Sequence, residues 1–148
     1  MLDSNFTQQR VLVVGEDSLF DQGVTRFLAQ RTDFVLSRTK FSGEHVFPNT
    51  IKQDDLPDVI LVCESGLLDT THILDLISSH AMAMKLLVVV IRLRNNVIDV
   101  YERPMNVAGM MMYIKSQQII AGTKDDLLNV IRRKHKALRE SSTYILQN

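Results

Sequence analysis

The sequence has a single cysteine, no net formal charge and no long uninterrupted apolar stretch. One cysteine cannot form an internal disulfide, and it excludes a metal site built from several cysteines. The balance of 17 basic and 17 acidic residues leaves no overall field that would attract the chain to nucleic acid or to a membrane surface. No apolar run reaches the length of a membrane-spanning helix, and the first ten residues, MLDSNFTQQR, lack the apolar centre of a secretion signal. We therefore predict one cytoplasmic domain, which 148 residues ordinarily form.

Several common enzyme motifs are also absent. After the first apolar run the sequence reads VVGEDSLFDQG, which lacks the G-x-G-x-x-G turn of dinucleotide sites and carries two acids that would repel a pyrophosphate. The chain has no G-x-x-x-x-G-K-[ST] phosphate loop and no G-x-S-x-G nucleophile turn. Its four histidines are scattered, and no two have the spacing of metal ligands. We predict that the chain is not an enzyme and holds no metal or cofactor, and a flavodoxin-like enzyme or cofactor carrier is the least favoured alternative.

Apolar runs of strand length alternate with amphipathic segments. Strong runs at 10–14 (RVLVV), 57–64 (PDVILVCE) and 85–91 (KLLVVVI) are typical of strands buried on both faces of a sheet. Weaker patterns predict strands over 33–39 and 107–114. Helices are predicted over 19–28, about 70–80, 95–103 and 123–140, from capping residues and apolar spacing. The alternation predicts an α/β fold with a five-stranded parallel sheet and helices on both faces.

Two of these segments also carry a family resemblance. RVLVVGEDSLFDQGVTRFL (10–28) and LPDVILVCESGLLD (56–69) resemble the receiver domain of two-component response regulators, most closely receivers that precede a LuxR/NarL-type DNA-binding domain. The resemblance implies the flavodoxin-like (CheY-like) fold over 10–140, a flexible segment over 1–9, and the start of a linker or sixth helix over 141–148. It further implies a regulator of transcription that forms homodimers, binds a protein partner, or both, and that contacts DNA only through a C-terminal domain outside these 148 residues.

The residues that would carry phosphorylation chemistry differ from the family pattern. Receivers hold Mg²⁺ with an acidic pair, but these positions fall on Gly15 and Glu16, with Asp17 following. The phosphoacceptor aspartate falls on Cys63, and a thiol is not the carboxylate that forms an aspartyl phosphate. Glu64 is one residue away, which in a strand means the opposite face.

The two remaining positions of the pocket differ as well. The hydroxyl position falls on Ile91 or Arg92, and the lysine position falls on Tyr113, or on Lys115 if the last strand is shifted. We therefore predict a degenerate receiver that is not regulated by aspartyl phosphorylation. A redox switch at Cys63 is a further hypothesis, but acidic neighbours oppose a thiolate, so a small buried thiol is the favoured interpretation.

Binding surfaces follow from the resemblance too. It places the predicted helix over 95–103 in an exposed position, which would create an apolar dimerisation patch from Val97, Ile98, Val100 and Tyr101. The predicted helices over 19–28 and 123–140, which correspond to the first and fifth helices of receivers, form the other surface that the family uses.

The last residues give the alternative function. Tyr144 and Gln147, in the sequence YILQ, loosely match a motif that biofilm-type LuxR regulators use for cyclic di-GMP. Because Gln147 stands where the motif usually has an arginine, bidentate recognition of guanine or phosphate is lost. A cyclic di-GMP sensor remains the alternative function, and an ordinary packing helix is the other interpretation of this segment.

Overall fold

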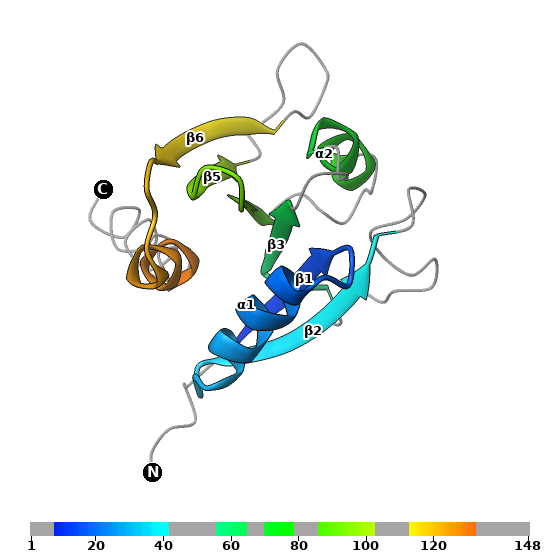
Figure 1. Cartoon of the computed structure of the whole chain (residues 1–148). Helices are drawn as coiled ribbons and strands as arrows, with labels where there is room; N and C mark the ends of the chain where they lie inside the picture. The colour runs from blue at the N-terminus through cyan, green and yellow to red at the C-terminus, as the bar shows by residue number, and fades with distance from the viewer. Residues whose placement is uncertain (1–7, 42–55, 65–69, 79–85, 103–112, 133–148) are drawn as a thin grey trace, which may run out of the picture.

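The structure is a computed structural model of the chain, and it describes residues 8–41, 56–64, 70–78, 86–102 and 113–132 (Figure 1). The strands are β1 (Gln9–Gly15), β2 (Phe34–Lys40), β3 (Val59–Glu64), β4 (Leu87–Arg92), β5 (Val97–Glu102) and β6 (Ile114–Ile119). The helices are α1 (Leu19–Ala29), α2 (Thr70–Ser78) and a helix described over 124–132. The prediction of an α/β fold is confirmed.

The strands form one mixed sheet in the order β2-β1-β3-β4-β5-β6. β1 pairs in parallel with β2 and β3, and β3 pairs in parallel with β4. β5 is antiparallel to both of its neighbours, β4 and β6. The predicted five-stranded, fully parallel sheet is therefore wrong in two respects, because the described residues form six strands and β5 runs against the others.

The segment predicted as a short helix over 95–103 is the origin of this difference. Residues 93–96 form a turn that joins β4 directly to β5 as a hairpin. Asn96 has a left-handed φ of 53°, which asparagine tolerates better than most residues. The β-branched Val97, Ile98 and Val100 that follow fit a pleated, buried surface, and this burial outweighs the weak helical pattern. The next strand begins at Ile114, where the predicted strand over 107–114 ends, and residues 107–112 lie outside the described ranges.

Helices cover both faces of the sheet, as predicted. Since successive residues of a strand point to opposite faces, the apolar runs supply two cores. One core lies beneath α1 and the helix over 124–132, and it includes Val11, Val13, Leu61, Leu128 and Ile131. The other lies beneath α2, and it includes Leu12, Val14, Ile60, Ile73 and Ile77. Figure 1 shows α1 lying along β1 and β2.

Two helix starts were correctly predicted from their capping residues. Ser18 caps α1, and its backbone N–H donates to the Asp21 carboxylate at 2.6 Å. Thr123 caps the helix over 124–132, where its hydroxyl accepts from the Asp126 N–H at 3.2 Å. Each reciprocal pair satisfies backbone donors that the first turn of a helix leaves unpaired.

The start of the sheet lies slightly earlier than expected. β1 begins at Gln9, the last residue of the segment predicted to be flexible, and the Gln9 side chain is buried. Its Nε2 donates to the carbonyl oxygen of Ile131 at 3.0 Å, which ties the start of β1 to the last described helix. The segment 141–148 lies outside the described residues. None of the helices in the described ranges is long and apolar enough to cross a membrane.

Candidate functional site

The turn after β1 is the first part of the predicted pocket. Asp21, in the first turn of α1, places its side chain against this turn. Asp21 is only 1% exposed, and its side chain lies directly over Gly15. A Cβ atom added at Gly15 would lie 2.5 Å from Asp21 Cγ, so only glycine fits there. Both Asp21 oxygens are near other groups, because Oδ1 caps α1 through Ser18 and Oδ2 lies 4.0 Å from Nε of Arg38. This residue was not predicted, although the S-x-x-D spacing of Ser18 and Asp21 is a capping signal.

The acids predicted for this turn have other roles. Asp17 takes a left-handed φ of 63° and forms an ion pair with Nη2 of Arg38, which projects from β2. Glu16 is half-buried at the turn between β1 and α1. Beside the half-buried Glu16, the turn after β1 therefore holds an exposed carboxylate bound to an arginine, and a buried carboxylate next to it serves as a helix cap.

Cys63, near the end of β3, is a core residue. It is 1% exposed and packs in the core beneath α1, with Leu61 and Val89 among its cluster. Burial, together with the negative charge of Asp21, raises the pKa of the Cys63 thiol to about 12. The thiol is therefore protonated at neutral pH, and the interpretation as a small buried thiol is confirmed.

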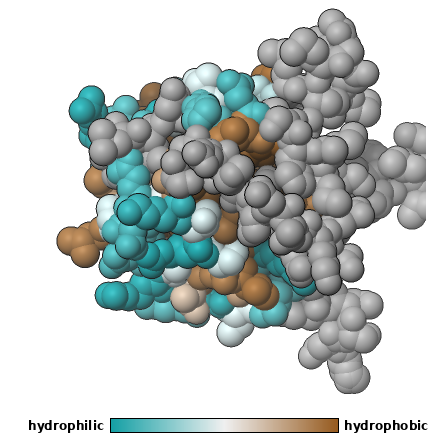
Figure 2. Space-filling view, turned by 90° about the vertical axis from the view of Figure 1, so that its right-hand side faces the viewer, coloured by the Kyte–Doolittle hydropathy of each residue, from teal (hydrophilic) through white to brown (hydrophobic). Residues whose placement is uncertain are grey.

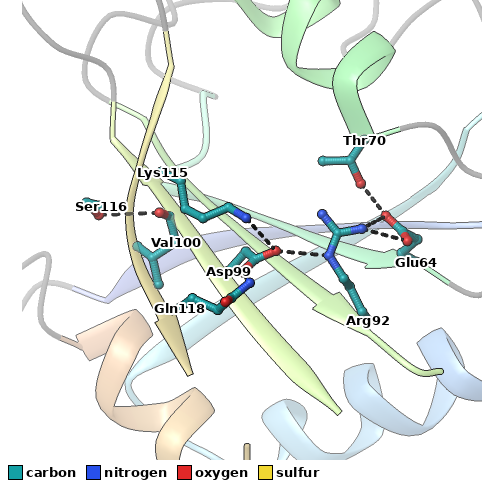
Figure 3. Close-up of polar contacts among 8 residues, drawn as sticks. All are labelled: Glu64, Thr70, Arg92, Asp99, Val100, Lys115, Ser116 and Gln118. Atoms are coloured by element: carbon teal, nitrogen blue, oxygen red, sulfur yellow. Dashed lines mark hydrogen bonds and ion pairs between the residues drawn. The ribbon is translucent and has the colours of Figure 1, made fainter. Parts of the chain in front are cut away.

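A network of ion pairs lies on the other face of the sheet, where Figure 3 shows it spanning β3 to β6. Glu64 and Arg92 are direct partners in the register of β3 and β4. Nη1 of Arg92 lies 2.8 Å and 2.7 Å from the two Glu64 carboxylate oxygens. Thr70, the first residue of α2, donates its hydroxyl to the same carboxylate. The Arg92 head group is thus held between the end of β3 and its second partner, Asp99 on β5.

Asp99 is the centre of this network and is fully buried. Its carboxylate accepts from Arg92 Nε at 2.9 Å and from Gln118 Nε2 at 2.8 Å, and Lys115 Nζ lies 3.4 Å away. Burial alone raises the pKa of the Asp99 carboxyl, but the hydrogen bonds and positive charges around it outweigh that effect and hold the pKa below its ordinary value. The network contains two carboxylates and two cations, so it is balanced in charge. Beside it, Ser116 donates to the Val100 carbonyl oxygen at 3.3 Å (Figure 3).

The structure therefore divides the predicted pocket between the two faces of the sheet. Cys63 and Ile91 are register partners that contribute to the core beneath α1. Arg92 and Lys115 meet at Asp99 on the opposite face, and Tyr113 packs against the core beneath α2. Asp99 and Gln118 were missed. A lone acid within the otherwise apolar run VIDVY is the signal for a buried charge in a strand, but the segment was interpreted as a helix.

The predicted dimerisation patch is wrong. Its members Val97, Ile98, Val100 and Tyr101 are between 3% and 9% exposed in β5. They are covered because β5 lies between β4 and β6 and both faces of this strand are packed. The ligand candidates Tyr144 and Gln147 lie outside the described residues.

On the face that Figure 2 shows, the exposed apolar residues among the described ones do not form one broad area. Figure 2 views the molecule from the side to which β1 and β2 point in Figure 1, and its brown apolar residues lie between teal hydrophilic ones. Within the described ranges, no group of three or more histidine, cysteine or acidic side chains is placed to hold a metal ion. No family model, curated protein or solved structure matches the chain.

Proposed function

We propose that the chain is a receiver-like regulatory domain of a transcriptional response regulator, and that it works without aspartyl phosphorylation. The observation that carries this proposal is the state of Cys63. It stands where the receivers that the sequence resembles carry their phosphoacceptor, but it is 1% exposed and remains a neutral thiol. It offers no carboxylate oxygen to a phosphoryl donor.

The turn after β1 supports the same proposal. A phosphoryl group needs a bound cation to offset its charge, and Mg²⁺ prefers carboxylate oxygens with room for water. Here Asp17 forms an ion pair with Arg38, and Asp21 caps α1. The Asp21 side chain also lies so close to the Gly15 backbone that no side chain fits at position 15. Of the two positions where receivers carry an acidic pair, only Glu16 is an acid, because the other is Gly15.

The order of the first four strands is compatible with a flavodoxin-like arrangement. β2, β1, β3 and β4 are parallel neighbours, α1 follows β1, and helices lie on both faces. The hairpin of β4 and β5 departs from that arrangement, since it replaces a helical crossover by a turn of four residues. In the proposal, the Arg92 network holds β4, β5 and β6 in one arrangement, and this arrangement does not change in response to phosphate.

The test is a phosphorylation and analogue-binding experiment on the whole chain. Mg²⁺ with beryllium fluoride should leave the amide NMR spectrum unchanged, and acetyl phosphate should add no phosphoryl mass. A conventional receiver treated in parallel is the control for the reagents. A magnesium-dependent shift of the amides at the ends of β1 and β3, or a hydroxylamine-sensitive phosphoryl group, contradicts the proposal.

In this proposal the domain is regulated by binding, either to a second copy of itself or to a partner protein. Self-association would use a surface other than the four buried side chains of β5. Size-exclusion chromatography with light scattering measures it directly. A monomer at every concentration removes the homodimer from the proposal, but it leaves the absence of phosphorylation standing.

A further inference from the structure

An apolar groove opens between α1 and the helix over 124–132, on the face of the sheet opposite the Arg92 network. Its volume is about 430 Å³, within the range of about 300 to 1,000 Å³ that small-molecule sites occupy. The floor comes from Ile91 and Ile98 of the β4–β5 hairpin, and the walls come from the two helices. Apolar side chains from those helices line it, including Phe20, Val24 and Leu127.

Gly23 is an unexpected residue in this wall. It lies in the interior of α1, where glycine costs roughly 1 kcal/mol of helix stability relative to alanine. A Cβ atom added at Gly23 would meet nothing within 4 Å, so no packing within the described structure requires glycine there. Gly15 differs, since its missing side chain is explained by the neighbouring carboxylate of Asp21. The absent side chain at Gly23 instead keeps the groove wide.

The charge of the groove points to the kind of occupant. Lys124 is the one ionisable residue among those that line it in the described part of the chain. Its Nζ lies 5.3 Å from the ring centroid of Phe27, at the edge of the apolar lining. Asn96 and Thr123 contribute the remaining polar groups, and the Thr123 hydroxyl is already engaged with Asp126 at 3.0 Å. Arg31, outside the lining, lies over the same ring at 5.1 Å from its centroid. An apolar chamber with a cation in its lining, and a second behind it, is complementary to an apolar molecule that carries a negative charge.

We propose that this groove binds a small ligand with an apolar body and a single anionic group, such as an aromatic or aliphatic carboxylate or sulfonate. The apolar body would lie against the hairpin floor beside Gly23, and the anionic group would face Lys124. A second copy of the chain is a poorer occupant, because a twofold contact centred on this groove would bring the two Lys124 residues toward each other. The inference does not rest on the absence of phosphorylation, since the groove lining includes neither Cys63 nor any member of the Arg92 network, and Ile91 from the predicted pocket contributes only apolar surface to it.

The test uses anilinonaphthalene sulfonate as an anionic probe and phenylnaphthylamine as its neutral counterpart. The whole chain should bind the sulfonate saturably at one site. The amides that shift in NMR spectra should belong to α1, to residues 122–127 and to the hairpin floor around Ile91, Asn96 and Ile98. Lys124→Met keeps an apolar side chain of similar length, so it should weaken sulfonate binding about threefold and leave the neutral probe unaffected. A shift spread over the whole sheet, or equal loss of both probes, contradicts the proposal.

A matched pair at Gly23 separates groove filling from helix stability. Gly23→Ala and Gly23→Leu should both raise the unfolding midpoint, because each removes a helix-interior glycine. Gly23→Ala should retain probe binding, but Gly23→Leu should abolish it by filling the groove. If Gly23→Leu binds both probes as the unaltered chain does, the groove is not the site. If the chain forms a dimer that the sulfonate does not disturb and that Gly23→Leu dissociates, the occupant is a second copy and the ligand proposal is overturned.

Discussion

Nη1 of Arg92 lies within 2.8 Å of both carboxylate oxygens of Glu64, which faces it across β3 and β4. The same guanidinium reaches the fully buried Asp99 through its Nε atom. One side chain thus joins the parallel strands to the antiparallel strand that follows them. A planar guanidinium suits this position because it donates in several fixed directions at once.

Replacing Arg92 should therefore destabilise the sheet strongly. Arg92→Met keeps the apolar stem but leaves Asp99 buried with less compensation, and we expect a loss of about 2 to 4 kcal/mol in the free energy of unfolding. Urea denaturation measures the change. Arg94→Gln in the exposed turn is the matched control and should change stability by about 0.5 kcal/mol or less. Similar losses for both variants would show that the network contributes nothing specific.

Acid should weaken the fold partly through Asp99. Its pKa is held below the ordinary aspartate value, so the folded state binds this proton less readily than the unfolded chain does. The resulting stability is fully present above the unfolded-state pKa of about 3.9 and is lost as the pH falls from there through the depressed folded-state value.

Asp99→Asn isolates this contribution. It should be less stable than the unaltered chain at neutral pH, and its stability should fall less steeply below about pH 4. Asp33, whose pKa is lowered first of all by its hydrogen bond from Arg132, remains in both proteins and so cancels in the comparison. The measurement is the urea midpoint of both proteins as a function of pH. If the two midpoints fall equally steeply in acid, the acid sensitivity comes from groups other than Asp99.

Cys63 should be chemically inert in the folded protein. With its pKa raised to about 12, very little thiolate exists near pH 8, and the side chain is 1% exposed. Iodoacetamide should therefore modify the native chain only at the rate of unfolding, and it should modify the urea-unfolded chain to completion. Rapid alkylation without urea, followed by mass spectrometry, would instead reveal a reactive thiol and revive the redox hypothesis.

Placing an acid at this position should not make the chain accept a phosphoryl group. Cys63→Asp places a carboxylate in an apolar core beside Asp21, and burying an unpaired charge next to a like charge costs about 3 kcal/mol or more. Cys63→Ala is the control and should cost about 1 to 2 kcal/mol as a small cavity. A stable Cys63→Asp protein that accepts phosphate from acetyl phosphate would contradict this expectation.

Two alanine substitutions of glycine should act in opposite directions. Gly15→Ala forces a Cβ to within 2.5 Å of a side chain fixed as a helix cap, and it should cost about 1 to 3 kcal/mol. Gly23→Ala meets open space in a helix and should gain about 0.5 to 1 kcal/mol. Thermal unfolding of both variants checks the pair. If Gly15→Ala leaves the unfolding midpoint unchanged, the Asp21 side chain can move away from position 15 without loss of stability.

Continuous apolar runs made the central strands predictable, because β1, β3 and β4 bury both faces and need no alternation. Caps at Ser18 and Thr123 likewise marked two helix starts. The segment at 97–102 was misassigned because its four apolar or aromatic residues and two acids follow an order that fits a short helix as well as a strand. Only its pairing with β4 and β6 decides between them, and pairing is a tertiary property.

The site was less predictable than the fold for the same reason. The spacing along the chain placed Cys63, Arg92 and Lys115 near one end of the sheet. It could not say that Arg92 and Lys115 share an acid on β5, since that acid was expected on a helix. Nor could it show that Asp21 covers Gly15, because this contact depends on how α1 leaves the turn.

The hairpin of β4 and β5 also bears on the order in which the chain folds. Arg92 and Asp99 are only seven residues apart, whereas Glu64 and Arg92 are 28 apart. Hairpins close within about 1 to 10 microseconds, and pairs that are distant along the chain are slower because a longer loop must be ordered first. We expect this half of the sheet to serve as an early template onto which β3 and β1 dock. Substitutions in the hairpin should then slow refolding, and those in β2, an edge strand, should mainly speed unfolding.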